Sequence, residues 1–166
     1  MALREIRTYP DEILNKISKP VTEMKPRFSE LIDDMLETMY SSGGVGLAAV
    51  QVGVLRRIVV IDVSPEADSP MVLINPEIIE MDGTQTGDEG CLSVPGKHGI
   101  VTRAMTCKVK CLNRDMEEVI LEGEGLLARC FQHEIDHLDG KMYVDKVEGE
   151  LENVYQEDFD EEDTED

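Results

Sequence analysis

The sequence predicts a fold that contains both helices and strands, with several strands between two helices. Apolar residues recur at helical spacing near residue 30 and near residue 130, and β-branched runs fill the interval between them. A chain of 166 residues with 41% hydrophobic content can bury one sizeable core and is too short for two comfortable ones. We therefore expect a single domain.

The first helix is predicted within residues 25–44. Pro26 suits a helix start, and Gly43 and Gly44 suit a helix end. Between them the apolar residues follow the spacing of one helix face: Phe28, Leu31, Ile32, Met35, Leu36, Met39 and Tyr40.

Strands are predicted from the β-branched segments "RRIVVIDV" (56–63) and "PMVLINPEII" (70–79). The segments "CKVKCL" and "EEVILEGE" flank the turn-forming "NRDM" and predict a hairpin over residues 107–124. Cys107 and Cys111 fall on one face of the first hairpin strand, which favours core packing over chemistry.

The second helix is predicted for "GLLARCFQHEIDHL", residues 125–138, ending before Gly140. At about 100° per residue, His133 and His137 share a face, and Glu134 lies at its edge. Leu126 and Cys130 fall on the histidine face. A separate apolar stripe is formed by Leu127, Phe131, Ile135 and Leu138.

The motif H-E-x-x-H on a helix predicts a divalent metal site, in which Glu134 takes a proton from the metal's water. The alternative is a solvent-facing charged helix with incidental histidines. The chain has only three histidines, and two of them have this spacing in an otherwise apolar helix, which favours the metal site.

The third metal ligand stays open on the residues alone. The extended metallopeptidase pattern would need a histidine where Tyr143 stands. A later glutamate would have to come from the acidic C-terminal segment, which shows no helical apolar stripe. His98 and the four cysteines are the other candidates, and Cys91 stands out because "DEGCLSVPG" could present its sulfur and nearby backbone N–H groups to a pocket.

The glycine-rich segment "GGVGLAAVQVG", residues 43–53, matches G-x-G-x-x-A only superficially. A dinucleotide site needs a strand before the motif and a helix after it, whereas here a helix comes first. We expect instead a loop whose backbone approaches another chain closely, with Gln51 offering an amide donor; an ordinary tight turn is the alternative.

Charge and composition limit the possible partners. Eleven of the 36 acidic residues lie in residues 148–166, which contain no basic residue, so residues 1–147 carry 25 acidic and 16 basic residues. The sequence therefore predicts a catalytic domain over residues 1–147 and a largely disordered acidic tail over residues 148–166. Direct nucleic-acid binding is disfavoured by this charge. The absence of a long apolar run or signal-like N-terminus and the use of cysteine predict a cytoplasmic protein without membrane contact.

Three stretches together resemble the signature motifs of peptide deformylases. They are "GVGLAAVQ" (44–51), "EGCLS" (89–93) and "QHEIDHLDG" (132–140), in that family's order, and the resemblance covers about residues 1–147. It implies an α+β fold with mixed or antiparallel sheets around a central helix bearing H-E-x-x-H. It also implies removal of the formyl group from N-formylmethionine on nascent polypeptides.

The resemblance also implies roles for individual residues. Cys91, His133 and His137 would hold one metal, with Fe²⁺ the expected native ion and Zn²⁺, Ni²⁺ or Co²⁺ able to replace it. Glu134 would move the proton, while the Gln51 amide and the Leu92 backbone N–H would meet the developing oxyanion. The expected substrate-binding residues are Val45, Gly46 and Gly90, which would pair with the peptide, and Leu126 and Cys130, which would line the side-chain pocket.

Departures from the family pattern concern the rim of the pocket and the tail. Val50, Gly87 and His98 replace residues more usual in the family. Some members dock on the ribosome through a basic C-terminal helix, which the acidic tail cannot imitate, so only transient ribosome proximity is expected. Two other classes stay open: a metallopeptidase or other amide hydrolase, which would cleave unformylated peptides, and a non-catalytic metal-binding module.

Overall fold

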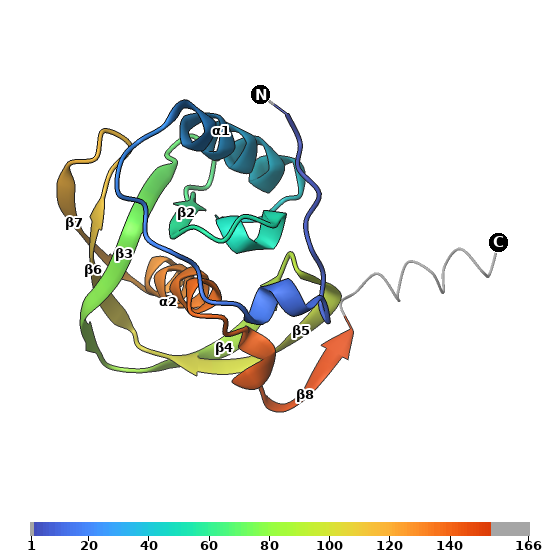
Figure 1. The fold of residues 1–166 in the computed structure, drawn as a ribbon. Helices are drawn as coiled ribbons and strands as arrows, with labels where there is room; N and C mark the ends of the chain where they lie inside the picture. Colours follow the sequence, from blue (N-terminus) through green and yellow to red (C-terminus); the bar gives the residue numbers. More distant parts are fainter. Residues whose placement is uncertain (1, 154–166) are drawn as a thin grey trace.

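The computed structural model describes residues 2–153 as two α-helices, eight strands and three short 3-10 helices (Figure 1). The helices are α1 (Pro26–Ser41) and α2 (Leu126–Leu138). The strands are β1 (Gly46–Ala48), β2 (Ile58–Ile61), β3 (Met71–Asp82), β4 (Gln85–Cys91), β5 (Val94–Arg103), β6 (Thr106–Leu112), β7 (Glu118–Glu124) and β8 (Glu148–Asn153). The 3-10 helices are η1 (Glu12–Asn15), η2 (Ala49–Val52) and η3 (Tyr143–Asp145).

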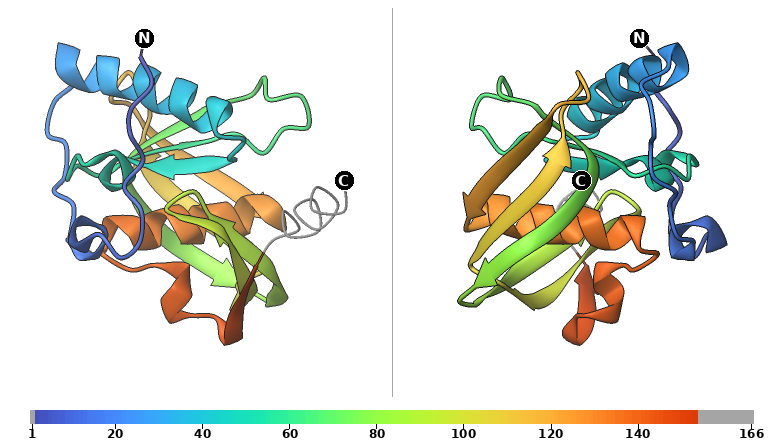
Figure 2. Two further views of the ribbon diagram at one scale, coloured as in Figure 1. Left: turned by 90° about the vertical axis from the view of Figure 1, so that its right-hand side faces the viewer. Right: turned by 60° about the vertical axis from the view of Figure 1, so that its left-hand side comes forward.

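The strands form two antiparallel sheets, so the expected α+β fold with two helices is confirmed. One sheet has the order β1-β2-β3-β6-β7 and the other the order β4-β5-β8. In the two views of Figure 2, α1 lies along one end of the molecule, and α2 passes across the long strands of the larger sheet. Helix α2 contacts β7, β1, β6 and β2 and thereby shares the core of that sheet.

Helix α1 has the predicted bounds to within a few residues. Pro26 occupies its first turn, where the missing N–H costs nothing. Its apolar stripe is buried with Leu47 and Ile58, and the chain leaves the helix through Gly43 at φ +73°.

Helix α2 is also confirmed, and it begins after Gly125 at φ +60°. Phe131 and Leu138 are completely buried in the core formed with the larger sheet. The helix ends before Gly140, where a Cβ would lie 2.5 Å from the carbonyl oxygen of Asn15 and φ is +77°. Glycine is therefore required at this position by both space and backbone conformation.

The predicted strands and hairpin are present, whereas β1, β4, β5 and β8 were not predicted. The turn-prone "DEGCLSVPG" (88–96) comprises the end of β4, the two connecting residues Leu92 and Ser93, and the start of β5. The expected boundary at residue 147 is wrong, because Glu148–Asn153 form β8 and pair with β5 through Lys97, His98 and Ile100. Residues 154–166 of the predicted tail lie outside the described part of the chain.

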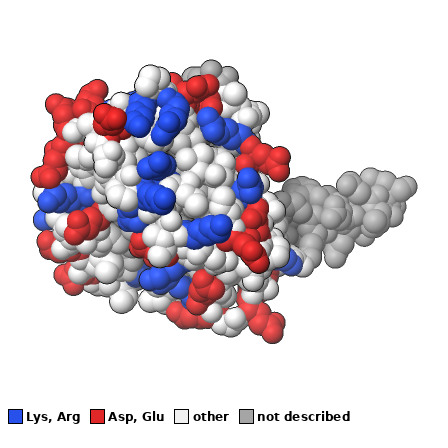
Figure 3. Space-filling view, in the orientation of Figure 1, with Lys and Arg blue, Asp and Glu red and all other residues white. Residues whose placement is uncertain are grey.

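Charge on the described surface is mixed. On the face in Figure 3, basic side chains occupy the middle of the view, and acidic ones lie mostly around its edge. No helix within residues 2–153 is long and apolar enough to cross a membrane.

Candidate active site

A cavity of about 510 Å³ lies between the segment that follows α1, the β4–β5 connection and one face of α2. Its walls combine backbone from glycine-rich segments with side chains from α2. The lining residues include Val45, Gly46, Gln51, Glu89, Gly90, Cys91, Leu92, Leu126, Arg129, Cys130, His133 and Glu134. All of the metal, catalytic and substrate-binding residues expected from the resemblance line this cavity except His137, which lies one helical turn from His133.

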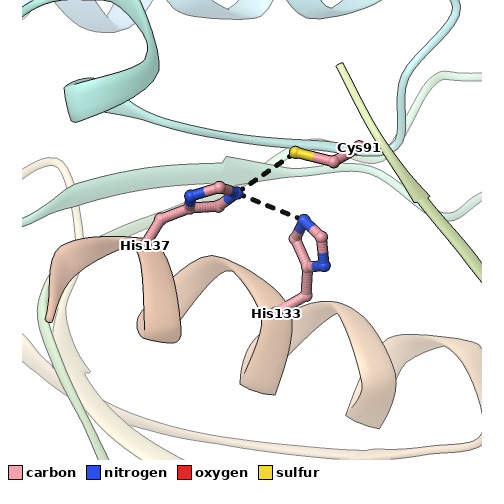
Figure 4. Close-up of side chains that lie close together, drawn as sticks. All are labelled: Cys91, His133 and His137. Carbon is pink, nitrogen blue, oxygen red and sulfur yellow. Dashed lines mark hydrogen bonds between the residues drawn. The ribbon is translucent and has the colours of Figure 1, made fainter. Parts of the chain in front are cut away.

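Three side chains that could hold a metal ion converge beside the cavity: Cys91, His133 and His137 (Figure 4). The Nε2 atom of His137 lies 3.3 Å from the Sγ atom of Cys91 and 3.3 Å from the Nε2 atom of His133. Typical bonds from a tetrahedral zinc ion to imidazole and thiolate place such atoms about 3.3 to 3.6 Å apart. The donor set therefore has the size and chemistry of a divalent metal site.

The pKa values of the two imidazoles, His133 and His137, are shifted in opposite directions. Burial opposes the charged form of His133, but Glu134 and Cys91 outweigh it and raise the pKa of His133 well above its usual value. Burial and the neighbouring His133 lower the pKa of His137 well below its usual value. A histidine binds a metal through a neutral ring nitrogen, so a cation bound here would take the place of a proton on this pair.

Glu89 orients His133 from the other side of the ring. Its Oε2 atom lies 2.6 Å from Nδ1 of His133, so Nδ1 donates the hydrogen bond and Nε2 faces the other donor atoms. Such carboxylate–histidine contacts orient metal ligands and strengthen them as bases. Glu89 lies two residues before Cys91 and therefore on the same face of β4.

Two arginines keep Glu89 ionised. Arg103 donates to both carboxylate oxygens, at 2.9 and 2.6 Å, and Arg129 donates to Oε1 at 2.8 Å. Burial alone would raise the pKa of Glu89, but the hydrogen bonds from Arg103 and His133 lower it well below its usual value. Sequence reasoning did not single out these three residues. The alternation along β4 could have suggested Glu89, but no local pattern pairs it with arginines on β5 and α2.

Glu134 lies on the cavity side of α2. Its Oε2 atom is 3.9 Å from Nε2 of His133, and its Oε1 atom is buried without a hydrogen-bond partner in residues 2–153. Burial raises the pKa of Glu134 to about 7. A Cβ at Gly46 would lie 2.6 Å from Oε2, so the glycine leaves the space that this carboxylate occupies.

Gln51 is held with its amide nitrogen toward the converging donors. Its Oε1 atom accepts a hydrogen bond of 2.9 Å from the Ala48 N–H. Its Nε2 atom donates to Oγ of Ser93 at 3.0 Å and lies 3.6 Å from Sγ of Cys91. Leu92 lines the same cavity, and its backbone N–H has no acceptor within residues 2–153.

The remaining cysteines and His98 do not join the metal-ligating group. Cys130 lines the cavity as a buried thiol, and burial raises its pKa to about 12. Cys107 and Cys111 are buried in the core, as predicted, and burial raises the pKa of each to about 11. His98 contacts Asp88 at 2.9 Å instead.

A buried carboxylate beside a Cys-His-His donor set, open to one cavity, defines the class of metal-dependent hydrolases. The sequence model of the polypeptide deformylase family matches residues 3–153. The chain belongs to this family. It is therefore a metal-dependent hydrolase that removes the formyl group from the N-terminal formylmethionine of nascent polypeptides.

Individual peptide deformylases are similar to this chain over most of its length. The chain is 63% identical to the peptide deformylase of Lachnoclostridium phytofermentans over 98% of its own length and 99% of the relative's. It is 61% identical to that of Agathobacter rectalis, over 95% and 98% of the two chains. The crystal structure of a Legionella pneumophila peptide deformylase superposes with a TM-score of 0.85 at 47% identity, covering 88% of this chain and 86% of that one. The crystal structure of the Thermotoga maritima peptide deformylase superposes with a TM-score of 0.84 at 43% identity, covering 89% of this chain and 99% of that one.

Proposed function

We propose that Cys91, His133 and His137 hold one divalent cation and that Glu134 is the proton carrier of the deformylation. The observation that carries this proposal is the convergence of three donor atoms within 4.8 Å of one another, beside a buried carboxylate that has an unpartnered oxygen. Fe²⁺ is the proposed native ion, and Zn²⁺, Ni²⁺ or Co²⁺ suit the same imidazole and thiolate ligands.

The cation would act as a Lewis acid and make water a nucleophile at neutral pH. Glu134 accepts the proton of the attacking water and returns it to the leaving amine, a task for which a pKa near neutrality is suited. The Gln51 amide and the Leu92 N–H donate to the formyl oxygen as negative charge develops on it. Glu89 stays ionised and keeps His133 in position.

The peptide would bind between two strand edges. Strand β1 is an edge of the five-stranded sheet and β4 is an edge of the three-stranded sheet, and both border the cavity. An extended peptide can therefore pair with Val45 and Gly46 on one side and with Gly90 on the other. Leu126 and Cys130 would then contact the side chain of the first residue.

The substrate is proposed to be met in the cytoplasm, where formylated chains are made. Residues 148–153 belong to β8, and the acidic residues beyond them offer no basic surface for ribosomal RNA. We propose that the protein reaches nascent chains without a docking helix. Ribosome co-sedimentation that depends on residues 154–166 and weakens with salt would contradict this.

Formate release from a formyl-methionyl peptide tests the assigned roles, using anaerobically purified protein loaded with Fe²⁺. Glu134→Gln should retain the metal and lower kcat by about 10²- to 10⁴-fold. Cys91→Ala should lose the metal, while Cys130→Ala, which removes a thiol from the same cavity, should keep it. A Cys91→Ala protein that retained stoichiometric metal would overturn the ligand assignment.

Oxygen sensitivity is a second consequence of the proposed Fe²⁺ and thiolate pair. Protein loaded with Fe²⁺ should lose activity in air faster than under nitrogen, because thiolate ligands are open to oxidation. The Ni²⁺-loaded protein serves as the control for slow unfolding. Equal decay of the Fe²⁺ protein in both atmospheres would contradict the expectation.

A further inference from the structure

Arg129 is the permanently charged side chain among the α2 residues Leu126, Arg129, Cys130 and His133 that line the cavity. Leu126, Arg129, Cys130 and His133 follow the spacing of a single helix face, and all line the cavity. Arg129 is only 7% exposed, so a cationic side chain forms part of the wall where an apolar pocket for methionine is expected.

The guanidinium of Arg129 is only partly used by the protein. Its Nη1 atom donates to Oε1 of Glu89 at 2.8 Å and to the carbonyl oxygen of Val101 at 3.2 Å. Its Nη2 atom makes no hydrogen bond to any residue from 2 to 153. Nor is Nη2 among the unpartnered atoms of that range that are sealed from solvent, so it keeps some exposure on a residue that lines the cavity.

The strand opposite leaves room in front of this nitrogen. Gly87 lies on the α2-facing side of β4, in step with Glu89 and Cys91. A Cβ built on Gly87 would have Nη2 of Arg129 as its neighbour, at 3.7 Å. Because glycine has no side chain, a space the size of one methyl group is left between β4 and this nitrogen.

We propose that Nη2 of Arg129 is a hydrogen-bond donor for the side chain of the first substrate residue, which makes Arg129 a specificity-determining residue. The favoured class is a formylated residue with an unbranched side chain that carries an acceptor near its end. Methionine sulfoxide fits, because oxidation gives methionine a polar oxygen without changing its length. The inference rests on the proposed function of the cavity.

The reaction itself is unchanged. Water adds to the formyl carbon, the bond from that carbon to nitrogen breaks, and formate and the free amine leave. The sulfoxide group is not changed in the reaction, because its oxygen only accepts a hydrogen bond from Nη2 of Arg129. Chains whose first methionine has been oxidised would therefore still be deformylated.

The test compares kcat/KM for three formylated tripeptides that differ only in their first residue: methionine, methionine sulfoxide and norleucine. Norleucine has the length of methionine and lacks an acceptor. The Fe²⁺ protein should prefer the sulfoxide over norleucine by about tenfold or more, the effect of a hydrogen bond to a charged group. A ratio of one or below would overturn the inference.

Matched variants separate donation to the substrate from support of Glu89. Arg129→Lys should keep a cation beside Glu89 but lose Nη2, and Gly87→Val should fill the space in front of it, so both should lower the sulfoxide-to-norleucine ratio toward one. Arg103→Lys also perturbs Glu89 but does not line the cavity, so it should lower both rates and preserve the ratio. An equal loss in all three variants would contradict the inference and leave Arg129 a positioning residue.

Different results would overturn the proposed function of the cavity and the inference about Arg129. Absence of turnover for the formyl-methionyl peptide, in protein shown to contain its metal, would overturn the proposed roles and this inference together. Normal turnover of methionine and norleucine without acceptance of the sulfoxide would overturn this inference alone.

Discussion

The two sheets present opposite kinds of surface to α2. In the five-stranded sheet, Val59 and Ile61 of β2 are fully buried and apolar on the α2 side, and Leu73 on β3 and Val109 on β6 extend the same core. In the three-stranded sheet, the α2-facing positions include Glu89, Cys91 and Arg103, which bind one another or the helix through polar groups.

This difference between the two sheets assigns the stability of the fold to one sheet and the support of the active site to the other. Burial of apolar area against the five-stranded sheet stabilises the fold, and this fixes the position of α2. The polar surface of the three-stranded sheet contributes one proposed ligand, Cys91, and the residues that support the site, whose desolvation is offset by pairing. One helix therefore carries a packing side and a reactive side, and substitutions on the two sides should have separable effects.

The largest expected effect is on the packing side. Phe131 is fully buried and contacts β7 at Gly123, where a Cβ would lie 3.0 Å from its ring. Phe131→Ala should lower the free energy of unfolding by about 3–5 kcal/mol, measured by denaturant titration. The metal affinity of the protein that remains folded should stay close to that of the unmodified chain. A large loss of metal affinity with little loss of stability would contradict the separation.

The next effect is on the reactive side. Glu89→Gln removes the charge that orients His133, so metal affinity should fall about 10- to 100-fold, measured by competition with a chelator. Asp136→Asn is the control, because Asp136 also binds Arg103, at 2.8 Å, but is not bonded to the ring of His133. Similar losses of metal affinity in both variants would refute a specific role for Glu89.

A smaller effect, on the pH dependence of the unfolding free energy, is expected for Asp62, which lies where the larger sheet supports the cavity wall. Asp62 follows β2, and its backbone N–H donates to the carbonyl oxygen of Val45. Burial alone would raise the pKa of Asp62, but hydrogen bonds from Ser64, Tyr40 and Ser69 lower it to about 2.

The sign of the pH effect follows from this lowered pKa. Because the folded pKa lies below the unfolded value of about 3.9, the ionised Asp62 stabilises the fold above about pH 4. That stabilisation should be lost as pH falls toward 2. The difference in unfolding free energy between the unmodified chain and Asp62→Asn should therefore shrink from pH 5 to pH 2. A constant difference would contradict the assignment.

The smallest effect is expected on the outer face of the five-stranded sheet. Lys108 on β6 lies 3.4 Å from Glu80 on β3 and 3.1 Å from Glu122 on β7. Both glutamates are largely exposed, so Lys108→Ala should change the free energy of unfolding by less than about 1 kcal/mol and leave formate release unaltered. A thermal shift as large as that of Phe131→Ala would contradict the comparison.

Local periodicity was sufficient to predict both helices, the β6–β7 hairpin and the segments that form β2 and β3. The residues of three separated stretches were also expected to share one site, and the structure brings them around one cavity. The helix and strand predictions succeeded because the relevant pattern lies within a dozen residues, as it does for the apolar stripe of α2, whereas the shared site was expected from the resemblance and not from a local pattern.

The missed features depend on contacts between distant segments. Strand β4 has polar residues and glycines on its inner side, so it lacks the apolar alternation that marks a strand. Arg103 and Arg129 are buried only because Glu89, from a third element, lies between them. The acidic composition of residues 148–153 predicted disorder, yet backbone pairing with β5 and the packing of Leu151 form a strand.

Strand β8 also has a consequence for shortened forms of the protein. Gly99 on β5 has no side chain, and a Cβ there would lie 2.7 Å from Val147 and 3.3 Å from Leu151. A chain that ended at residue 147 would lose Leu151 and leave the outer edge of β5 with unpaired backbone groups. Such an edge is a template for strands of other molecules. Strand β8 is therefore expected to limit self-association as well as completing the smaller sheet.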